Sequence, residues 1–105
     1  MRLTTPTKLV ILAFGIGAGY GFDIIDLTGL PSGTVYPILR RLERAGLLKS
    51  KWEPARIARQ QQRPPRRYYH LSGAGATLLR EVARDNPHLA AALPVPATDP
   101  SPVHA

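Results

Sequence analysis

The alternation of apolar and polar positions is most regular over residues 33–45, where it predicts an amphipathic helix. Its apolar side chains recur at i, i+3, i+4 and i+7 and form one stripe: Val35, Ile38, Leu39 and Leu42. Ser32 is the expected N-cap, and Gly46 is the expected C-terminal stop. The opposite face carries side chains spaced four residues apart: Tyr36, Arg40 and Arg44. We therefore expect this helix to pack through its apolar face and to offer the other face to a partner.

Three further helices are predicted. The first covers about residues 6–16 and has Thr5 as its N-cap, and a short second helix covers about residues 20–27. Only a tight turn with Gly and Pro separates this second helix from the amphipathic one, which is the arrangement of a helix-turn-helix. The last helix, about residues 73–84, begins after Ser72 as its N-cap.

Between the amphipathic helix and the last helix, the pattern changes to that of two strands. Residues 47–53 alternate in part, and residues 66–71 are rich in aromatic side chains. The residues between them, 54–65, are rich in Arg, Gln and Pro, so we expect a long, basic and flexible tip. The predicted fold class is therefore mainly α with a small β-wing: a winged helix-turn-helix of three helices, a two-stranded antiparallel wing and a short C-terminal helix.

The domain is expected to cover residues 1–85. Residues 86–105 are expected to form a Pro-rich, disordered tail, in which residues 88–93 are compatible with one more helical turn. The apolar run at residues 9–16 is far shorter than the roughly 20 residues that a membrane-spanning helix needs. We therefore predict a buried first helix and no membrane association.

Positive charge is concentrated in one window of the sequence. Ten of the fourteen Lys and Arg residues lie between residues 40 and 67 together with two Glu, which gives net +8, whereas four basic and five acidic residues elsewhere give net −1. Such a concentration is typical of a surface that binds phosphates. The window contains most of the amphipathic helix and the wing. We therefore predict double-stranded DNA as the partner, with recognition helix 33–45 in the major groove and basic wing 54–67 on the backbone or in the minor groove.

Several short stretches follow one another in a specific order between residues 8 and 83: residues 20–25, 28–30, 32–43, 46–48, 52–53 and 67–72. In this order and spacing they resemble the PadR family of bacterial transcriptional regulators. The resemblance implies a winged helix-turn-helix and, usually, a homodimeric repressor that reads a palindromic operator.

The resemblance also implies which residues approach DNA. The recognition-helix positions are Ser32, Gly33, Thr34, Tyr36, Pro37 and Arg40, and the basic wing is matched by Arg63, Arg66 and Arg67. The charge pattern adds further basic side chains of the helix and wing: Arg41, Arg44, Lys51, Arg56 and Arg59. Arg40 or Arg41 would read guanine edges, and the Tyr36 hydroxyl would donate to a phosphate. Trp52 is expected to pack between the wing and the core.

The sequence contains no arrangement typical of catalysis or metal binding. It has no Cys, its three His residues are scattered, and no Gly-rich stretch has the context of a nucleotide site. We therefore predict no enzymatic activity, no metal and no cofactor. A DNA-binding protein of this kind is expected in the cytoplasm, associated with the nucleoid.

The predicted C-terminal region is short for the family, which usually dimerises through long C-terminal helices. A homodimer would have to use the apolar residues of the first and last helices, and an effector ligand cannot be assigned from the sequence. The alternative function is that of a winged-helix adaptor, which binds a protein partner through the first helix and the tail. In that case the basic residues would support only solubility and non-specific association with DNA.

Overall fold

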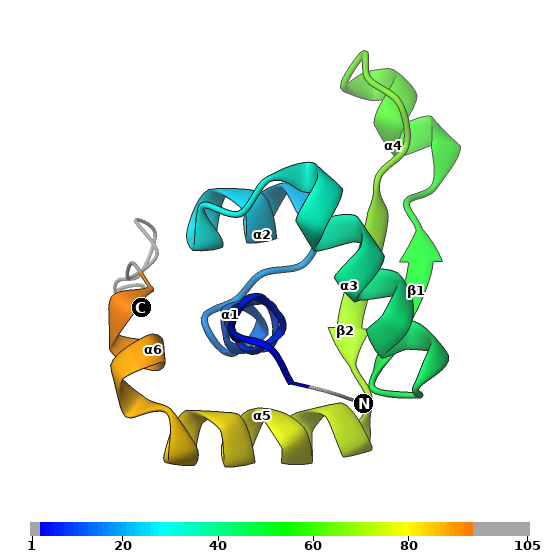
Figure 1. The fold of residues 1–105 in the computed structure, drawn as a ribbon. Helices are drawn as coiled ribbons and strands as arrows, with labels where there is room; N and C mark the ends of the chain where they lie inside the picture. Colours follow the sequence, from blue (N-terminus) through cyan, green and yellow to red (C-terminus); the bar gives the residue numbers. More distant parts are fainter. Residues whose placement is uncertain (1–2, 94–105) are drawn as a thin grey trace, which may run out of the picture.

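The structure is a computed structural model, and it describes residues 3–93. Its elements follow the chain in this order: α1 (Thr5–Gly15), α2 (Gly21–Thr28), α3 (Ser32–Arg44), β1 (Leu48–Trp52), α4 (Ala55–Gln60), β2 (Arg67–Leu71), α5 (Gly73–Asp85) and α6 (Pro87–Ala92). Figure 1 shows a helical body from which the wing extends, with α4 at its far end. The predicted class, mainly α with a two-stranded antiparallel wing, is confirmed.

Helix α1 lies at the centre of the helical body. In Figure 1 it is seen end-on, and it packs against α2, α3, α5 and α6. Its residues from Val10 to Ala13 are all buried, so the helix is enclosed on nearly every side. A helix that is apolar all round is stable only in such a position, which explains the run of apolar residues in its sequence. The prediction of a buried first helix is confirmed.

The helix-turn-helix consists of α2, a short turn and α3. Gly29 ends α2 with a left-handed backbone (φ 73°), a conformation that glycine adopts without strain. The predicted stripe of α3 faces the core, because all four of its apolar residues are buried. Pro37 lies inside α3 but close enough to its first turn to be accommodated.

Two of the predicted N-caps are wrong by one residue. Thr4, not Thr5, caps α1, and its hydroxyl accepts a hydrogen bond from the Thr7 N–H at 3.3 Å. Ser32 lies within α3, because the extended backbone of Pro31 already precedes the first helical turn. The prediction for Ser72 is confirmed, since its hydroxyl accepts from the Gly75 N–H at 3.1 Å. Such differences are common because helix ends fray and sequence signals for adjacent residues are similar.

The wing is attached to the helical body through its backbone. Strands β1 and β2 pair antiparallel, with Trp52 opposite Arg67 at the outer end. On the other edge of β2, the Tyr69 N–H donates to the Gly19 carbonyl at 2.8 Å, just before α2 begins. Tyr69 is buried whereas Tyr68 is half-buried, as expected for adjacent residues on opposite faces of a strand.

The predicted flexible tip is wrong in one respect, because residues 55–60 form α4. Arg, Ala and Gln favour helices, and Pro54 precedes the first turn, where a missing N–H has no effect. Ala58 is fully buried, and its carbonyl accepts a hydrogen bond from the Arg63 N–H at 3.1 Å. The tip is thus a short basic helix at the outer end of the wing.

Helices α5 and α6 cover the remaining side of α1. The expected boundary at residue 86 does not coincide with the end of the folded part, because residues 87–92 form α6, and Leu89, Ala90 and Leu93 pack against the core. Here apolar packing outweighs a composition that favours disorder, and the further helical turn expected at 88–93 is present. The predicted tail from residue 94 onward lies outside the described residues. Between residues 3 and 93, no helix is long and apolar enough to cross a membrane.

Candidate nucleic-acid interface

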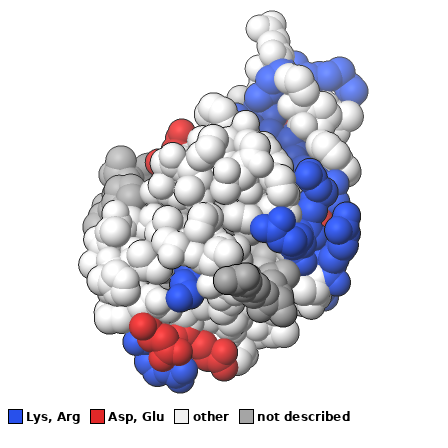
Figure 2. Space-filling view, in the orientation of Figure 1, with Lys and Arg blue, Asp and Glu red and all other residues white. Residues whose placement is uncertain are grey.

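The outer face of α3 and the wing together form one basic surface. Figure 2 shows Lys and Arg side chains gathered along this edge of the molecule up to α4, whereas most acidic atoms in the view lie near α5. Arg40 and Arg44 are exposed on α3, and a groove of about 260 Å³ separates α3 from the wing. The groove is lined by Arg40, Glu43, Arg44, Arg67 and Tyr69.

Both acidic residues of the basic window are neutralised within the protein. Glu43 accepts a hydrogen bond from the Arg67 guanidinium at 3.4 Å, and Glu53 forms an ion pair with Arg63 at 2.6 Å. The other basic residues of the window have no ion-pair partner in the part of the chain that the structure describes: Arg40, Arg41, Arg44, Lys49, Lys51, Arg56, Arg59 and Arg66. Residues 40–67 therefore keep the excess of positive charge that the sequence indicates.

Glu53 and Arg63 form a clasp at the base of α4. The carboxylate of Glu53 is only 4% exposed and accepts two hydrogen bonds from the Arg63 guanidinium, at 2.6 and 2.9 Å. It also accepts from the Arg66 N–H at 3.3 Å and from the Tyr68 hydroxyl at 3.4 Å. The hydrogen bond from Arg63 is the largest cause that lowers the pKa of Glu53 from 4.5 to about 2. Arg63 is thus engaged in holding the wing together.

The two arginines that follow the clasp lie against aromatic rings. The Arg66 guanidinium lies 4.5 Å from the centre of the Tyr20 ring and donates to the Tyr20 hydroxyl at 2.8 Å. The Arg67 guanidinium lies 5.6 Å from the centre of the Trp52 ring and donates to the Ser50 hydroxyl at 2.9 Å. These contacts fix two positive charges at the inner side of the wing.

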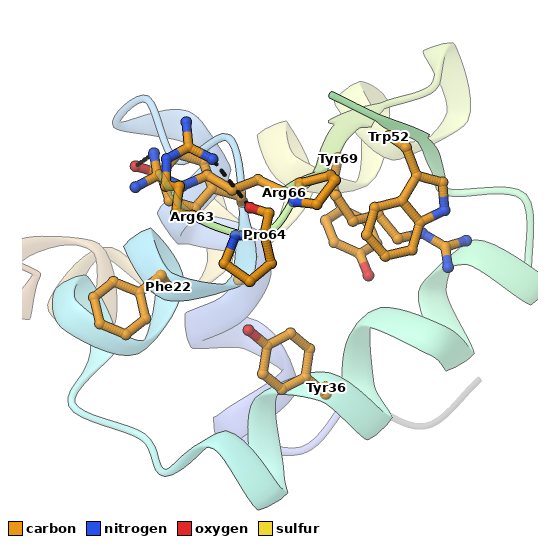
Figure 3. A pocket seen from close by; sticks show the side chains of 11 residues that line it. Phe22, Tyr36, Trp52, Arg63, Pro64, Arg66 and Tyr69 are labelled. Carbon is orange, nitrogen blue, oxygen red and sulfur yellow. Dashed lines mark hydrogen bonds between the residues drawn. The ribbon is translucent and has the colours of Figure 1, made fainter. Parts of the chain in front are cut away.

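A second, larger cleft of about 550 Å³ lies between α2, α3 and the wing. Figure 3 shows Phe22 from α2, Tyr36 from α3, and Trp52 and Tyr69 from the wing around it. Trp52 is 63% exposed, so the prediction that it packs between the wing and the core is wrong. The prediction followed the family position, whereas Trp52 lies at the outer end of β1, opposite Arg67, and lines the cleft.

Tyr36 is positioned by the glycine that faces it. A Cβ atom added to Gly21 would lie 2.5 to 2.7 Å from Cε1, Cζ and the hydroxyl oxygen of Tyr36, so a larger residue would displace the end of this side chain. The ring is 38% exposed and forms part of the cleft wall. Sequence reasoning did not assign Tyr20, Gly21 and Phe22 to a site, because their contact with Tyr36 and the wing joins residues that are distant along the chain.

The predicted interface residues fall into groups. Arg40, Arg44 and Arg67 meet around the groove, and Tyr36, Arg63, Arg66 and Arg67 meet around the larger cleft. At the start of α3, Ser32 and Gly33 are exposed, Thr34 and Pro37 are half-buried, and Arg41 lines neither cavity.

Three predicted residues lie apart from these groups. Lys51 is next to Ser50 and Trp52 in β1 and so points to the other face of the wing. Arg56 and Arg59 are exposed on α4, at the far end of the wing (Figure 1). Among residues 3–93, no group of three or more His, Asp and Glu side chains is placed to hold a metal ion.

Comparisons with known proteins support one family. Residues 16–81 match the transcriptional regulator PadR-like family. A PadR-like transcription factor from Bacteroides fragilis is 31% identical, with a TM-score of 0.59 over 78% of this chain and 81% of that one. A PadR family regulator from Eggerthella lenta is 30% identical, with a TM-score of 0.59 over 81% of this chain and 77% of that one. No curated protein matches the sequence.

A more distant similarity shows the fold alone. BpsR from Bordetella bronchiseptica is 21% identical and has a TM-score of 0.67 over 84% of this chain, which spans 59% of the length of BpsR. The match to the family covers more than half of the present chain, and it includes α2, α3 and the whole wing. The expectation drawn from the order of the sequence motifs is thereby confirmed: the chain belongs to the PadR-like family of transcriptional regulators.

Proposed function

We propose that this PadR-like regulator binds double-stranded DNA in a sequence-specific manner, with α3 in the major groove and the wing on the adjacent backbone. The observation that carries the proposal is the basic surface shared by α3 and the wing, where the exposed Arg40 and Arg44 line a groove with Arg67 and have no ion-pair partner among the described residues. We further propose that it acts as a repressor on the nucleoid, as its family membership favours.

Residues on α3 would carry the sequence information. Arg40 and Arg44 are exposed, lie one turn apart and point away from the buried stripe. An Arg side chain in the major groove can donate two hydrogen bonds to guanine, which is the commonest base-specific contact. The free backbone N–H groups at the start of α3, next to Ser32 and Gly33, can donate hydrogen bonds to a phosphate of the DNA backbone.

The wing would contribute affinity rather than sequence reading. Arg67 faces the groove beside α3, and Arg56 and Arg59 on α4 would reach phosphates farther along the duplex. Arg63 has a supporting role, because its guanidinium is bound to Glu53. Each phosphate that a basic side chain neutralises steepens the logarithmic salt dependence of binding by about 0.9.

The test is a fluorescence-anisotropy titration of a duplex from the region upstream of the gene and of a scrambled duplex, at low and at physiological salt. We expect Arg40→Ala to weaken binding of the first duplex by about tenfold or more and to reduce the preference over the scrambled one. Arg59→Ala should weaken both duplexes equally and reduce the salt slope by about 0.9. Arg80→Ala, an exposed change on α5, is the matched control. Unchanged selectivity of Arg40→Ala would contradict the role of α3.

A homodimer through α1 and α5 is part of the same proposal. Phe14 of α1 and Leu78 and Leu79 of α5 are only half-buried in one chain. Two chains would bind the two halves of a palindromic site. Light scattering after size-exclusion chromatography measures the mass directly. A chain that stays monomeric and still binds one half-site per molecule would contradict the dimer but not the role of α3.

A further inference from the structure

The large apolar side chains that the fold leaves exposed are gathered at one place. Among residues 3–93 they are Phe22, Tyr36 and Trp52, and all three line the larger cleft between α2, α3 and the wing (Figure 3). Phe22 and Trp52 are each 63% exposed. Single exposed apolar residues are common on protein surfaces, whereas a group of them marks a surface that binds a partner. The cleft is therefore an interaction surface.

Trp52 is held in position although it is not buried. It lies on the same face of β1 as Ser50, whose hydroxyl donates to Glu43 of α3 at 2.6 Å, so this face of the wing is turned toward α3. The Arg67 guanidinium lies 5.6 Å from the centre of the Trp52 ring. The next residue, Glu53, is held in the clasp. The indole ring therefore has little freedom to lose when a partner covers it.

Positive charge lies beside these aromatic rings. Arg66 and Arg67 line the same cleft, and no carboxylate between residues 3 and 93 forms an ion pair with Arg66. A partner that fits the cleft must therefore offer negative charge next to apolar surface. The backbone of DNA has this composition, because each phosphate is joined to a deoxyribose ring with apolar carbon atoms.

The cleft is continuous with the surface proposed for DNA. Arg67 and Tyr69 line both the cleft and the groove beside α3, where Arg40 and Arg44 lie. Tyr36 of the cleft wall belongs to α3 itself. A duplex that receives α3 in its major groove therefore brings one of its two backbones to the cleft.

We propose that Trp52 and Phe22 are uncharged contacts to the DNA backbone, an inference that rests on the proposed function. Their rings lie against deoxyribose carbons, and Arg66 binds a phosphate next to these sugars. The two rings contribute affinity for any duplex, because every nucleotide carries the same sugar. Unlike an arginine contact, this affinity is nearly independent of salt, because an apolar contact displaces no counterions from the phosphates.

The first experiment tests whether DNA covers Trp52 in the unaltered chain. The protein has one Trp, so its indole fluorescence reports this position alone. Quenching by acrylamide is measured in the free chain and with a saturating duplex, and the anisotropy of a labelled duplex shows that the complex has formed. We expect the quenching constant to fall about threefold or more, because a contact excludes solvent from the ring. An unchanged quenching constant in the complex would overturn the contact.

Substitution of the ring measures its contribution to affinity. We expect Trp52→Ala to weaken the upstream and the scrambled duplex by the same factor, about fivefold or more, and to leave the salt slope unchanged. Trp52→Phe keeps an aromatic ring and should retain most of the affinity. His70→Ala is the matched control, because it removes an exposed ring from the opposite face of the wing and should change neither affinity nor slope.

The salt slope separates a direct contact from a positioning role. If Trp52 acted only by holding Arg67, Trp52→Ala would reduce the slope by about 0.9, as the loss of one phosphate contact does. Such a change in slope would overturn the direct contact. A loss confined to the upstream duplex would overturn the assignment to the sugars, because it would show that the ring reads bases. Phe22→Ala should behave as Trp52→Ala does, and unchanged affinity would remove Phe22 from the contact.

The proposed function and this inference fail in different ways. A chain that binds neither duplex at low salt would refute both of them. A chain that binds DNA while Trp52 stays open to acrylamide would keep the proposed function and refute the inference. If circular dichroism shows that Trp52→Ala does not fold, the acrylamide measurement on the unaltered chain still decides the question.

Discussion

Around α1, apolar side chains from α1, α2, α3 and α5 are almost completely removed from water, whereas the outer wing is held together by polar groups. In the body, Ile11, Ile24 and Leu39 are each at most 1% exposed. In the wing, the Glu53–Arg63 clasp, the Arg66–Tyr20 contact and the backbone bond to Gly19 take the place of a core. The stability of the fold and the arrangement of the outer surface therefore depend on different forces, so each can be changed separately.

The largest effect is expected from a change in the body. Leu39→Ala removes a fully buried side chain from the stripe of α3 and should lower the free energy of unfolding by about 2–5 kcal/mol. The wing should unfold in the same transition as the helical body, because the wing has no core of its own. Urea denaturation followed by circular dichroism measures the decrease in the free energy of unfolding. If the signal of the wing persisted after the helices had unfolded, the wing would not depend on the body for its stability.

A second change tests the contact where the body meets the start of the wing. Gly75→Ala would place a Cβ atom against the carbonyl oxygen of Leu47, a backbone atom that cannot rotate away. We expect a loss of about 1–3 kcal/mol in the free energy of unfolding.

Gly73→Ala in the same helix is the matched control, since a Cβ there meets no atom within 4 Å. It should be neutral or raise the free energy of unfolding by about 0.4–1 kcal/mol, because alanine restricts the unfolded chain. Similar effects of the two substitutions would show that helix propensity, rather than the contact with Leu47, determines the change in the free energy of unfolding.

A change in the clasp should act on the wing alone. Arg63→Gln leaves the Glu53 carboxylate without its main partner, so α4 and the residues around it should exchange their amide hydrogens faster. Amides of α1 should keep their protection, and global stability should fall less than in the two variants above. Arg84→Gln, which removes a fully exposed pair with Asp85, is the control and should change neither region. Uniform loss of protection would indicate that wing and body form one cooperative unit.

The smallest effect near neutral pH concerns the titration of Glu53. Its pKa is about 2 in the folded protein and 4.5 ordinarily, so its stabilising contribution is present above pH 4.5 and is lost as the pH falls towards 2. NMR signals of α4 should therefore change over this range before those of α1. In Arg63→Gln the same change should occur at higher pH, because the carboxylate has lost the donor that lowers its pKa. Simultaneous changes in α1 and α4 would contradict a local effect.

Sequence reasoning succeeded where contacts are local. The stripe of α3 repeats every three or four residues and the strands alternate every two, so their buried faces follow from spacing. It failed where partners are distant along the chain. Nothing in the spacing shows that Arg66 meets Tyr20, 46 residues away, or that Arg63 binds Glu53 and so does not face outward. The exposure of Trp52 was missed for the same reason. Helix α4 was missed although its residues favour a helix locally, because the composition of residues 54–65, rich in Pro and Gln, indicated a loop.

The clasp has a consequence for how such wings can diversify. Glu53 and Arg63 join the two ends of the segment that contains α4, so the sheet is closed off by this ion pair rather than by α4 itself. Residues 54–62 are therefore an interchangeable insert: longer, shorter or differently charged segments can be exchanged at this position while the frame stays intact. The length and charge of the wing tip can thus evolve, or be engineered, independently of α3.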